Sequence, residues 1–204
     1  MIKSGIFDVG GVLHAYDDND SLIENDIKKT LEISPDVFEK AWSSMTPLLQ
    51  RGEISEAEYW KKFLSETKTT KPLPKESLLV REFSKAFSPR KDVLAIVREL
   101  KNNGYKLAVL SNTILPHVEF LEKRGIFNDF DVRVFSDSVG ITKPDPQIYL
   151  LTLNKLGVSA EEAFYVDDKE KYVKPANSLG MHGILFSNAE KLKKDLKEIA
   201  VELN

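Results

Sequence analysis

The stretch "GIFDVGGVLH", residues 5–14, decides the fold and raises the first question about function. A short apolar run ends in a single carboxylate, Asp8, and the pair Gly10 and Gly11 follows it. No lysine follows the glycines, so the stretch is not a P-loop, in which a Gly-Lys pair binds phosphate. A lone aspartate at the end of a buried strand, followed by bare backbone, indicates a ligand site at the carboxyl end of that strand.

Length and composition exclude several classes of protein. The chain has 204 residues, of which 42% are hydrophobic and 30% charged, as expected for one globular domain or one domain with a smaller insert. The net charge of -3, with Lys and Glu interspersed, argues against a nucleic-acid partner. There is no cysteine, so disulfides, a thiolate nucleophile and a Cys-built metal site are excluded. Neither a leader nor an apolar segment of membrane-spanning length is present, so we expect a cytoplasmic protein without a membrane partner.

Strand-like runs alternate with helical patterns over most of the chain. The strand-like runs are residues 3–9, 105–111, 131–137, 163–168 and 182–186. Glycines at positions where helices end in a left-handed residue are Gly104, Gly125, Gly157 and Gly180. This alternation predicts the α/β class: a Rossmann-like, doubly wound parallel sheet with helices on both faces and ligands at the carboxyl ends of its strands.

One interval interrupts the alternation. Residues 16–87 show no strand pattern, whereas Ser34 followed by Pro35 predicts a helix start, and Ser55 with Glu58 predicts a capping box. We expect an all-helical cap at 16–87 that covers the ligand site, and an α/β core formed by residues 1–15 and 88–204. The last stretch, residues 188–204, predicts an amphipathic helix with the apolar positions Leu192, Leu196, Ile199 and Leu203.

Four strand ends carry polar residues that the predicted sheet brings to one edge. They are Asp8, Ser111-Asn112-Thr113, the loop with Lys143-Pro144, and Asp167-Asp168. Each alone has a structural explanation as a turn or a helix cap. Together, carboxylates suit Mg²⁺, a hydroxyl and bare backbone N–H groups suit phosphate oxygens, and a lysine offsets charge. The set predicts phosphoryl transfer.

The order of these motifs resembles the haloacid dehalogenase-like (HAD) hydrolase superfamily, in which a helical cap lies between the first two motifs. The matching motifs are Asp-x-Gly-Gly-Val, Leu-Ser-Asn-Thr, Lys-Pro-Asp-Pro-x-Ile-Tyr and Val-Asp-Asp. The stretches "QRGEISEAEYW" (50–60) and "VDDKEKYVKPANSLGM" (166–181) are similar to the branch with bacterial glucose-1-phosphate phosphatases and the N-terminal phosphatase domain of soluble epoxide hydrolase.

The resemblance implies a role for each residue at this edge. Asp8 would be the nucleophile, forming an aspartyl-phosphate that water hydrolyses. Mg²⁺ would be held by Asp8, the carbonyl of Gly10 and Asp168, with Asp167 close by. Ser111 would donate a hydrogen bond to a phosphoryl oxygen, and Lys143 would orient Asp8 and offset charge. The phosphate-binding set it implies is Val9, Gly10, Ser111, Asn112 and Lys143.

The cap would select the substrate. The resemblance places Arg51 in a cap loop that faces the core, where it would bind a substrate hydroxyl or a second phosphate. A solvated arginine before a helix is the alternative. The acidic cluster at 17–20 lacks the ligand spacing of a calcium loop, so helix capping explains it better.

The chain departs from the family pattern at Gly10, where most phosphatases of the superfamily carry a second aspartate that acts as acid and base. Such help is worth about 10²- to 10⁴-fold, so we expect reduced activity and a leaving group that needs little protonation, as in a sugar 1-phosphate. His14 and Tyr16 are candidate substitutes, although His14 also suits a hinge or packing role. Tyr172 stands where many relatives have Asn, and we expect no consequence from that change.

We therefore expect a Mg²⁺-dependent phosphatase acting on a small phosphorylated metabolite, with a sugar phosphate favoured. One alternative is a 2-haloacid dehalogenase, in which Asp8 would attack carbon without a metal; the pair Asp167-Asp168 argues against it. The other is a phospho-ligand or partner-binding protein with weak catalysis, which the set of Asp8, Lys143 and Asp168 disfavours. The sequence leaves the oligomeric state open.

Overall fold

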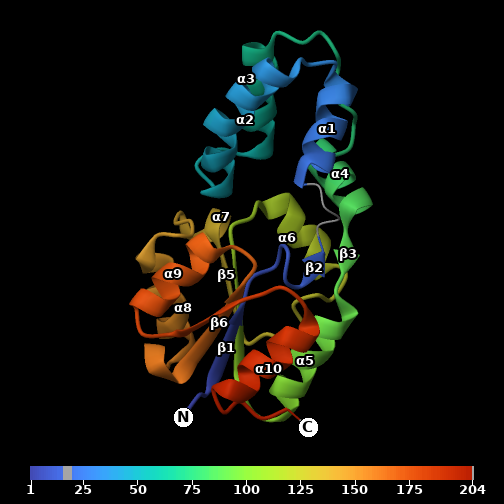
Figure 1. Cartoon of the computed structure of the whole chain (residues 1–204). Coiled ribbons are helices and arrows are strands. Elements are labelled where there is room, and N and C mark those ends of the chain that lie inside the picture. Colours follow the sequence, from blue (N-terminus) through green and yellow to red (C-terminus); the bar gives the residue numbers. More distant parts are fainter. Residues whose placement is uncertain (16–19, 204) are drawn as a thin grey trace.

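The computed structural model describes residues 1–15 and 20–203 and contains a five-stranded sheet (Figure 1). Its strands are β1 (Ser4–Phe7), β4 (Lys106–Ser111), β5 (Val132–Phe135), β6 (Ala163–Asp167) and β7 (His182–Leu185). The order is β5-β4-β1-β6-β7, and all four neighbouring pairs are parallel. The chain builds outward from β1 in both directions, so the predicted doubly wound α/β sheet is confirmed, with its switch point beside β1.

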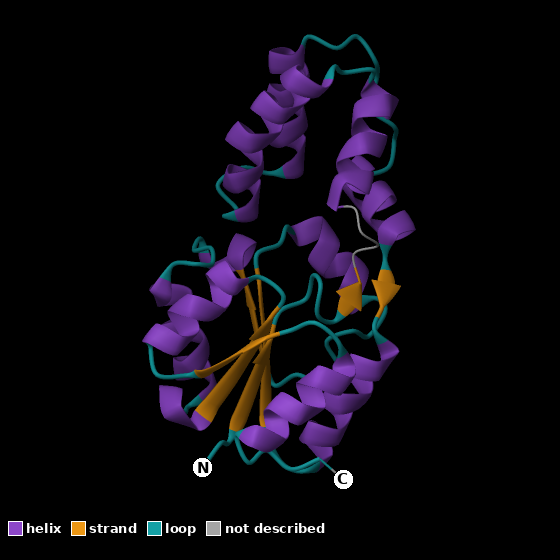
Figure 2. Ribbon diagram, in the orientation of Figure 1, coloured by secondary structure: helices purple, strands orange, loops and turns teal. Residues whose placement is uncertain are grey.

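Side chains of the central strands alternate between two apolar layers. Phe7, Val109 and Val166 pack in one layer, and their chain neighbours Ile6 and Tyr165 pack in the other. Helices α5 (Lys91–Asn102) and α10 (Ala189–Glu198) contribute to the first layer, and α8 (Pro146–Leu156) and α9 (Glu170–Ser178) to the second (Figure 2). Burial on both faces explains why the strands have nearly continuous apolar sequences.

The remaining core elements are α6 (Leu115–Glu122), α7 (Ser136–Val139) and the 3-10 helix η1 (Ala160–Glu162). Left-handed glycines are confirmed at all four expected positions, with φ between 70° and 91° at Gly104, Gly125, Gly157 and Gly180. The predicted C-terminal helix was too long, because α10 ends at Glu198 and Ala200 adopts a φ of 58°. Ile199 and Leu203 still pack against the core, from beyond the helix.

Between residues 20 and 87, every regular element of the described chain is a helix. These helices are α1 (Asp20–Leu31), α2 (Pro35–Gln50), α3 (Glu56–Thr67) and α4 (Leu78–Ala86). They share an apolar cluster, which Ile114 of the core joins and in which the rings of Phe38 and Phe63 lie 5.5 Å apart. The capping box is confirmed, since Ser55 and Glu58 exchange backbone-to-side-chain hydrogen bonds at the start of α3.

The chain enters and leaves this helical segment at adjacent points. Strand β2 (His14–Ala15) pairs antiparallel with β3 (Ser88–Pro89), so the two crossings lie side by side (Figure 1). Strands of two residues are too short to leave a periodic pattern in the sequence. Their pairing supports the division that we propose, with a cap at 16–87 and a core at 1–15 and 88–204.

No helix in the described residues is both long and apolar enough to pass through a lipid bilayer.

The loop after α2 touches the core at Gly52. This glycine has a φ of 65°, and a Cβ placed on it would lie 2.1 Å from the backbone oxygen of Asp137 in α7. A backbone oxygen cannot rotate away as a flexible side chain can. Only glycine therefore allows this close approach between the helical segment and the core.

We predict that Gly52→Ala destabilises the protein more than Gly104→Ala does. Gly104 also has a positive φ, 85°, but a Cβ there would meet nothing within 4 Å. Gly104→Ala should lower the free energy of unfolding by about 1 kcal/mol through backbone strain alone, and Gly52→Ala by at least about 2 kcal/mol. Urea unfolding of both variants measures the difference, and equal losses would show that the contact with Asp137 contributes nothing.

Candidate active site

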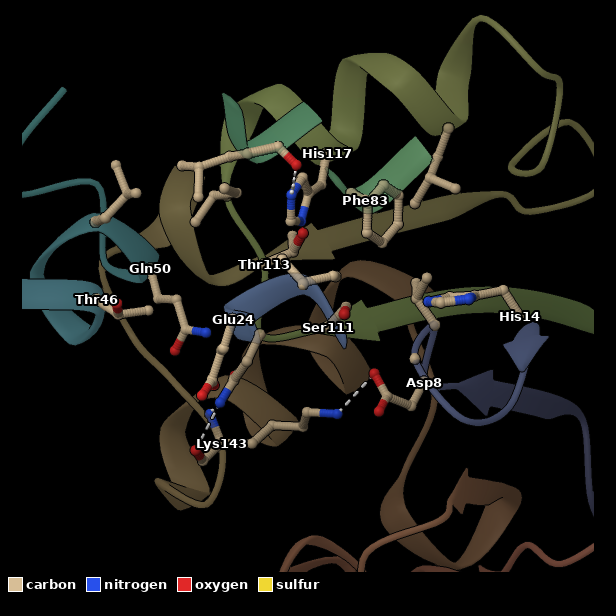
Figure 3. Close-up of a pocket in the computed structure, with 18 of the residues that line it drawn as sticks. Asp8, His14, Glu24, Thr46, Gln50, Phe83, Ser111, Thr113, His117 and Lys143 are labelled. Carbon is tan, nitrogen blue, oxygen red and sulfur yellow. Dashed lines mark hydrogen bonds and ion pairs between the residues drawn. The ribbon is translucent and has the colours of Figure 1, made fainter. Parts of the chain in front are cut away.

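Three buried polar side chains lie at the carboxyl ends of neighbouring strands, as the sequence predicted. Asp8 directly follows β1, Ser111 ends β4 and Asp167 ends β6. Lys143 joins them from the loop between α7 and α8, and Figure 3 shows it reaching toward Asp8. Asp8, Lys143 and Asp167 are only 7%, 3% and 0% exposed. Charged groups this deeply buried require partners.

Lys143 is the shared partner of two carboxylates. Its Nζ lies 2.9 Å from Oδ1 of Asp8 and 2.7 Å from Oδ2 of Asp167. Asp167 Oδ2 also accepts a hydrogen bond from the Tyr165 hydroxyl, and its Oδ1 accepts one from the backbone N–H of Lys169 at 2.9 Å. Both oxygens of Asp167 thus accept hydrogen bonds, and Oδ2 is the one that contacts Lys143. The sequence did carry a sign of Tyr165, since residues two apart on a strand share a face.

Asn112 holds the backbone of Lys143. Its Nδ2 donates to the Lys143 carbonyl at 2.9 Å, and its Oδ1 accepts from the Lys143 N–H at 2.8 Å. The next residue, Thr113, is held by the buried Ser136 hydroxyl, which bonds both its N–H and its carbonyl. The Asn112 side chain therefore has a positioning role that the sequence did not reveal, and its part in phosphate binding stays a prediction.

The charges at this edge shift each other's pKa values. Burial raises the pKa of Asp8 from 3.8 to about 6, an effect that Lys143 opposes and Asp167 reinforces. Burial lowers the pKa of Lys143, but Asp8 and Asp167 outweigh it and hold that pKa above its ordinary value. Burial also raises the pKa of Asp168, against the opposing effect of Lys169. Lys143 thus does not balance the negative charge of these carboxylates, and a bound cation would stabilise their ionised forms.

The oxygen atoms present fit a hard divalent cation. Asp8, Asp167 and Asp168 each offer a carboxylate oxygen, and these atoms lie within 4.8 Å of one another. Asp168 Oδ1 is buried and has no hydrogen-bond partner among the residues that the structure describes. Two backbone hydrogen bonds bridge Gly10 and His14: the His14 N–H donates to the Val9 carbonyl, and the Gly11 N–H donates to the His14 carbonyl. Neither bond uses the Gly10 carbonyl. Oxygen donors of this kind suit Mg²⁺.

Gly11, rather than Gly10, has the backbone that requires glycine. The φ of Gly11 is 79°, and Gly10 is not among the glycines with positive φ. A Cβ on Gly11 would lie 2.4 Å from Cγ of Asp168. The structure thus supports a need for glycine at Gly11, through its packing against Asp168, whereas the role of Gly10 stays a prediction.

A cavity of about 280 Å³ lies between helices α1–α4 and this edge of the sheet. The predicted residues that line it are Asp8, Val9, Gly10, Ser111, Asn112 and Lys143. Arg51 is not among the lining residues, and its guanidinium pairs with Glu53 in the same loop. The role in substrate binding that we assigned to Arg51 therefore stays a prediction without support from the geometry.

His14, the candidate substitute for the missing acid, and Tyr172, which stands where many relatives have Asn, also line the cavity. The buried His14 places Nδ1 2.9 Å from the Ala15 carbonyl and packs its ring 5.3 Å from Phe83, which supports the packing role. Tyr172 lies beneath Lys143, whose Nζ is 4.8 Å from the ring centroid. Tyr172 therefore contacts the site, although we expected no consequence from it. Tyr16, and the acidic cluster at 17–20 except for the backbone of Asp20, lie outside the described residues.

His117 is a cavity residue that the sequence did not single out. Its ring stacks on Phe83 at 4.1 Å, and its Nε2 lies 3.3 Å from the carbonyl of Leu79 in α4. Burial lowers the pKa of His117 to about 4, so it is neutral at pH 7. It joins α6 to α4 through contacts between residues far apart in sequence, which no local pattern indicates.

The chain belongs to the haloacid dehalogenase-like hydrolases. The model of that family matches residues 2–180, which include every strand end described above except that of β7. The chain is therefore an enzyme of the hydrolase class, and the predicted superfamily is confirmed.

Individual relatives agree with this assignment. Glyceraldehyde 3-phosphate phosphatase of Methanopyrus kandleri is 38% identical over 95 residues, covering 46% of this chain and 41% of that protein. Bifunctional epoxide hydrolase 2 of Sus scrofa is 30% identical over 135 residues, covering 62% of this chain and 24% of that protein. The chain thus spans less than half the length of either relative, and the second supports the predicted resemblance to soluble epoxide hydrolase.

A solved structure matches nearly the whole fold. A HAD family enzyme of Bacteroides thetaiotaomicron, in complex with magnesium and inorganic phosphate, superposes with a TM-score of 0.77. The match has 22% sequence identity and covers 92% of this chain and 95% of that one. At this identity the likeness shows the shared fold.

We predict that Asp8 destabilises the metal-free protein as pH rises. Because the pKa of Asp8 is raised to about 6 in the folded state, its favourable contribution is present while it is protonated and is lost as pH rises through that value. Asp8→Asn should therefore gain stability over the wild type between about pH 4 and 7, by on the order of 2–3 kcal/mol.

Urea unfolding in excess chelator at several pH values measures this difference. Adding Mg²⁺ should shrink it, because the cation stabilises ionised Asp8. A difference that stays constant with pH would show that Asp8 has an ordinary pKa.

Proposed function

We propose that this chain is a Mg²⁺-dependent phosphatase that hydrolyses a small phosphorylated metabolite, with a sugar phosphate favoured. One observation carries the proposal. Asp8, held by Lys143, and Asp168, whose buried Oδ1 has no partner among the described residues, lie together beside the cavity. A nucleophilic carboxylate, a neutralising lysine and oxygen ligands for a hard cation are the parts that phosphoryl transfer requires. The expected location in the cytoplasm stays a prediction.

The proposed cation ligands are Asp8, the carbonyl of Gly10 and Asp168. Asp167 would support them from close by, since both of its oxygens already accept hydrogen bonds. When bound, Mg²⁺ would offset the charge on the phosphoryl oxygens and help to orient them.

The proposed reaction has two steps. A carboxylate oxygen of Asp8 attacks phosphorus, and an aspartyl-phosphate forms as the bond to the leaving oxygen breaks. Water then hydrolyses the acyl phosphate, which releases inorganic phosphate and regenerates Asp8. Lys143 orients Asp8 in both steps and offsets the charge on the transferring group. The Ser111 hydroxyl and the backbone N–H groups of the loop after Asp8 would donate to phosphoryl oxygens.

The cavity and the loop restrict the substrate. A volume of about 280 Å³ is small for a ligand site, since pockets for drug-sized molecules measure about 300–1,000 Å³. Gly10 supplies no acid to protonate the leaving oxygen, which favours leaving groups more acidic than a plain alcohol. A sugar 1-phosphate meets both conditions, because the molecule is small and its leaving oxygen is that of a hemiacetal.

The alternative reaction, dehalogenation at carbon, makes less use of this site. That chemistry needs no metal, yet three carboxylates gather here and one buried oxygen of Asp168 has no protein partner. A binding protein with weak catalysis would not need Lys143 placed between Asp8 and Asp167.

We predict that Mg²⁺ is required for phosphate release from an aryl phosphate. Excess chelator should abolish the release and Mg²⁺ should restore it, because the oxygen ligands act only around a hard cation. Asp8→Asn should lower the rate at least about a thousandfold, since an amide cannot form the acyl phosphate. Full turnover in chelator would contradict the metal dependence, and a tenth of the wild-type rate in Asp8→Asn would contradict the nucleophile. Halide release from a 2-haloacid by the metal-free enzyme would favour dehalogenation.

We predict that Gly10→Asp raises activity most for substrates with poor leaving groups. The new carboxyl group would donate a proton to the leaving oxygen, with a gain of up to about 10²–10⁴ for an alkyl phosphate and a smaller one for an aryl phosphate. The measured quantity is the ratio of kcat/KM for the two substrates, variant over wild type. Gly10→Asn is the matched control, because it adds similar bulk without an acid. An unchanged ratio in a folded, metal-binding Gly10→Asp variant would show that another group already serves as the acid.

A further inference from the structure

The wall of the cavity opposite Asp8 combines apolar surface with a few polar groups. Trp42, Leu49 and Tyr59 of helices α2 and α3 contribute apolar surface. Glu24 of α1 and Thr46 and Gln50 of α2 contribute the polar groups, and Figure 3 shows all three across the cavity from Asp8. The leaving group of a substrate bound at Asp8 would meet this wall.

This wall carries a negative charge and no positive one among the residues that the structure describes. Glu24 is an acid, and none of the described residues of α1–α4 that line the cavity is Lys or Arg. Residues 16–22, "YDDNDSL", contain neither type in the sequence. The cations that line the described cavity, Lys143 and Lys169, both come from outside the helical segment.

Among the residues that the structure describes, the charges around the cavity leave no net positive charge for a second anion. Asp8, Asp167, Asp168 and Glu24 supply four negative charges near the site. Two lysines and one bound Mg²⁺ only match them. One phosphoryl group, with a charge of about -1.5 to -2 at pH 7, already uses the positive side of the site. A second phosphate or a carboxylate on the leaving group would lie against Glu24 in a partly desolvated space, where like charges repel strongly.

We propose that Glu24 is a specificity-determining residue, and that the substrate's leaving group is a small, uncharged, hydroxyl-bearing compound without a second phosphate or carboxylate. This inference rests on the proposed phosphatase function and narrows its substrate class. Hydroxyl groups would donate hydrogen bonds to the Glu24 carboxylate and exchange them with Gln50 and Thr46. The apolar face of a sugar or polyol would pack on Trp42 and Tyr59.

The test compares two ligands that differ by one phosphate, a hexose 1-phosphate and the hexose 1,6-bisphosphate. Their kcat/KM values and their competitive Ki values against an aryl phosphate are measured with Mg²⁺ present. In the wild type the bisphosphate should be at least about tenfold worse by both measures, because its second phosphate meets Glu24. Glu24→Gln should shrink that ratio at least about threefold, and Glu24→Lys should reverse the preference.

Glu39→Gln is the matched control, because it removes the same charge as Glu24→Gln. Glu39 lies exposed on α2 and does not line the cavity. Its ratio should equal that of the wild type. Provided that the enzyme turns over the aryl phosphate, two results would overturn the inference. They are a wild-type preference for the bisphosphate and a ratio that Glu24→Gln does not change. Absence of that turnover counts instead against the phosphatase function. The thermal shifts that the two hexose phosphates produce in wild type and Glu24→Gln would then decide the binding preference.

Discussion

The ion pairs of one buried lysine with two carboxylates determine how this edge of the sheet is built. Lys143 contacts Asp8 at 2.9 Å and Asp167 at 2.7 Å, and all three side chains are nearly inaccessible to water. Removing Lys143 would leave two buried carboxylates without a compensating charge, which costs several kcal/mol. The parallel pairing of β1 with β6 brings the two aspartates to the same height, and Asn112 holds the backbone of the lysine between them.

The same arrangement explains why the site suits a cation as well as a phosphoryl group. Lys143 supplies one positive charge for two carboxylates. Asp168 adds a third carboxylate, whose buried Oδ1 has no hydrogen-bond partner in the described part of the chain. Burial raises the pKa of Asp8 to about 6, and a bound divalent cation would lower that pKa again. Gly11 allows the loop to pass close to Asp168, and Gly10 leaves the position after Val9 without an acid.

The core and the helical segment divide the work of the site. Every group that we assign to the chemical steps comes from the carboxyl edge of the sheet, whereas the wall across from Asp8 comes from α1–α4. The paired strands β2 and β3 carry the chain between these two parts, and the Gly52–Asp137 approach holds the loop after α2 against the core. Substitutions in the helical wall should therefore change which substrate reacts, with little effect on how phosphate is transferred.

The sequence by itself determined the five strands, their parallel pairing and the meeting of Asp8, Ser111, Lys143 and Asp167, because these follow from short periodic patterns and from the geometry of parallel sheets. The order of the strands around β1 came from the structure. Only the tertiary structure decided what each of several other residues contacts. Asn112 binds the backbone of Lys143 across 31 positions, and Arg51 pairs with Glu53 outside the cavity. Glu24 reaches the cavity wall, and His117 stacks on Phe83. The contacts of Asn112, Glu24 and His117 join segments far apart in the chain, and they depend on how the helices pack against the sheet rather than on any local pattern.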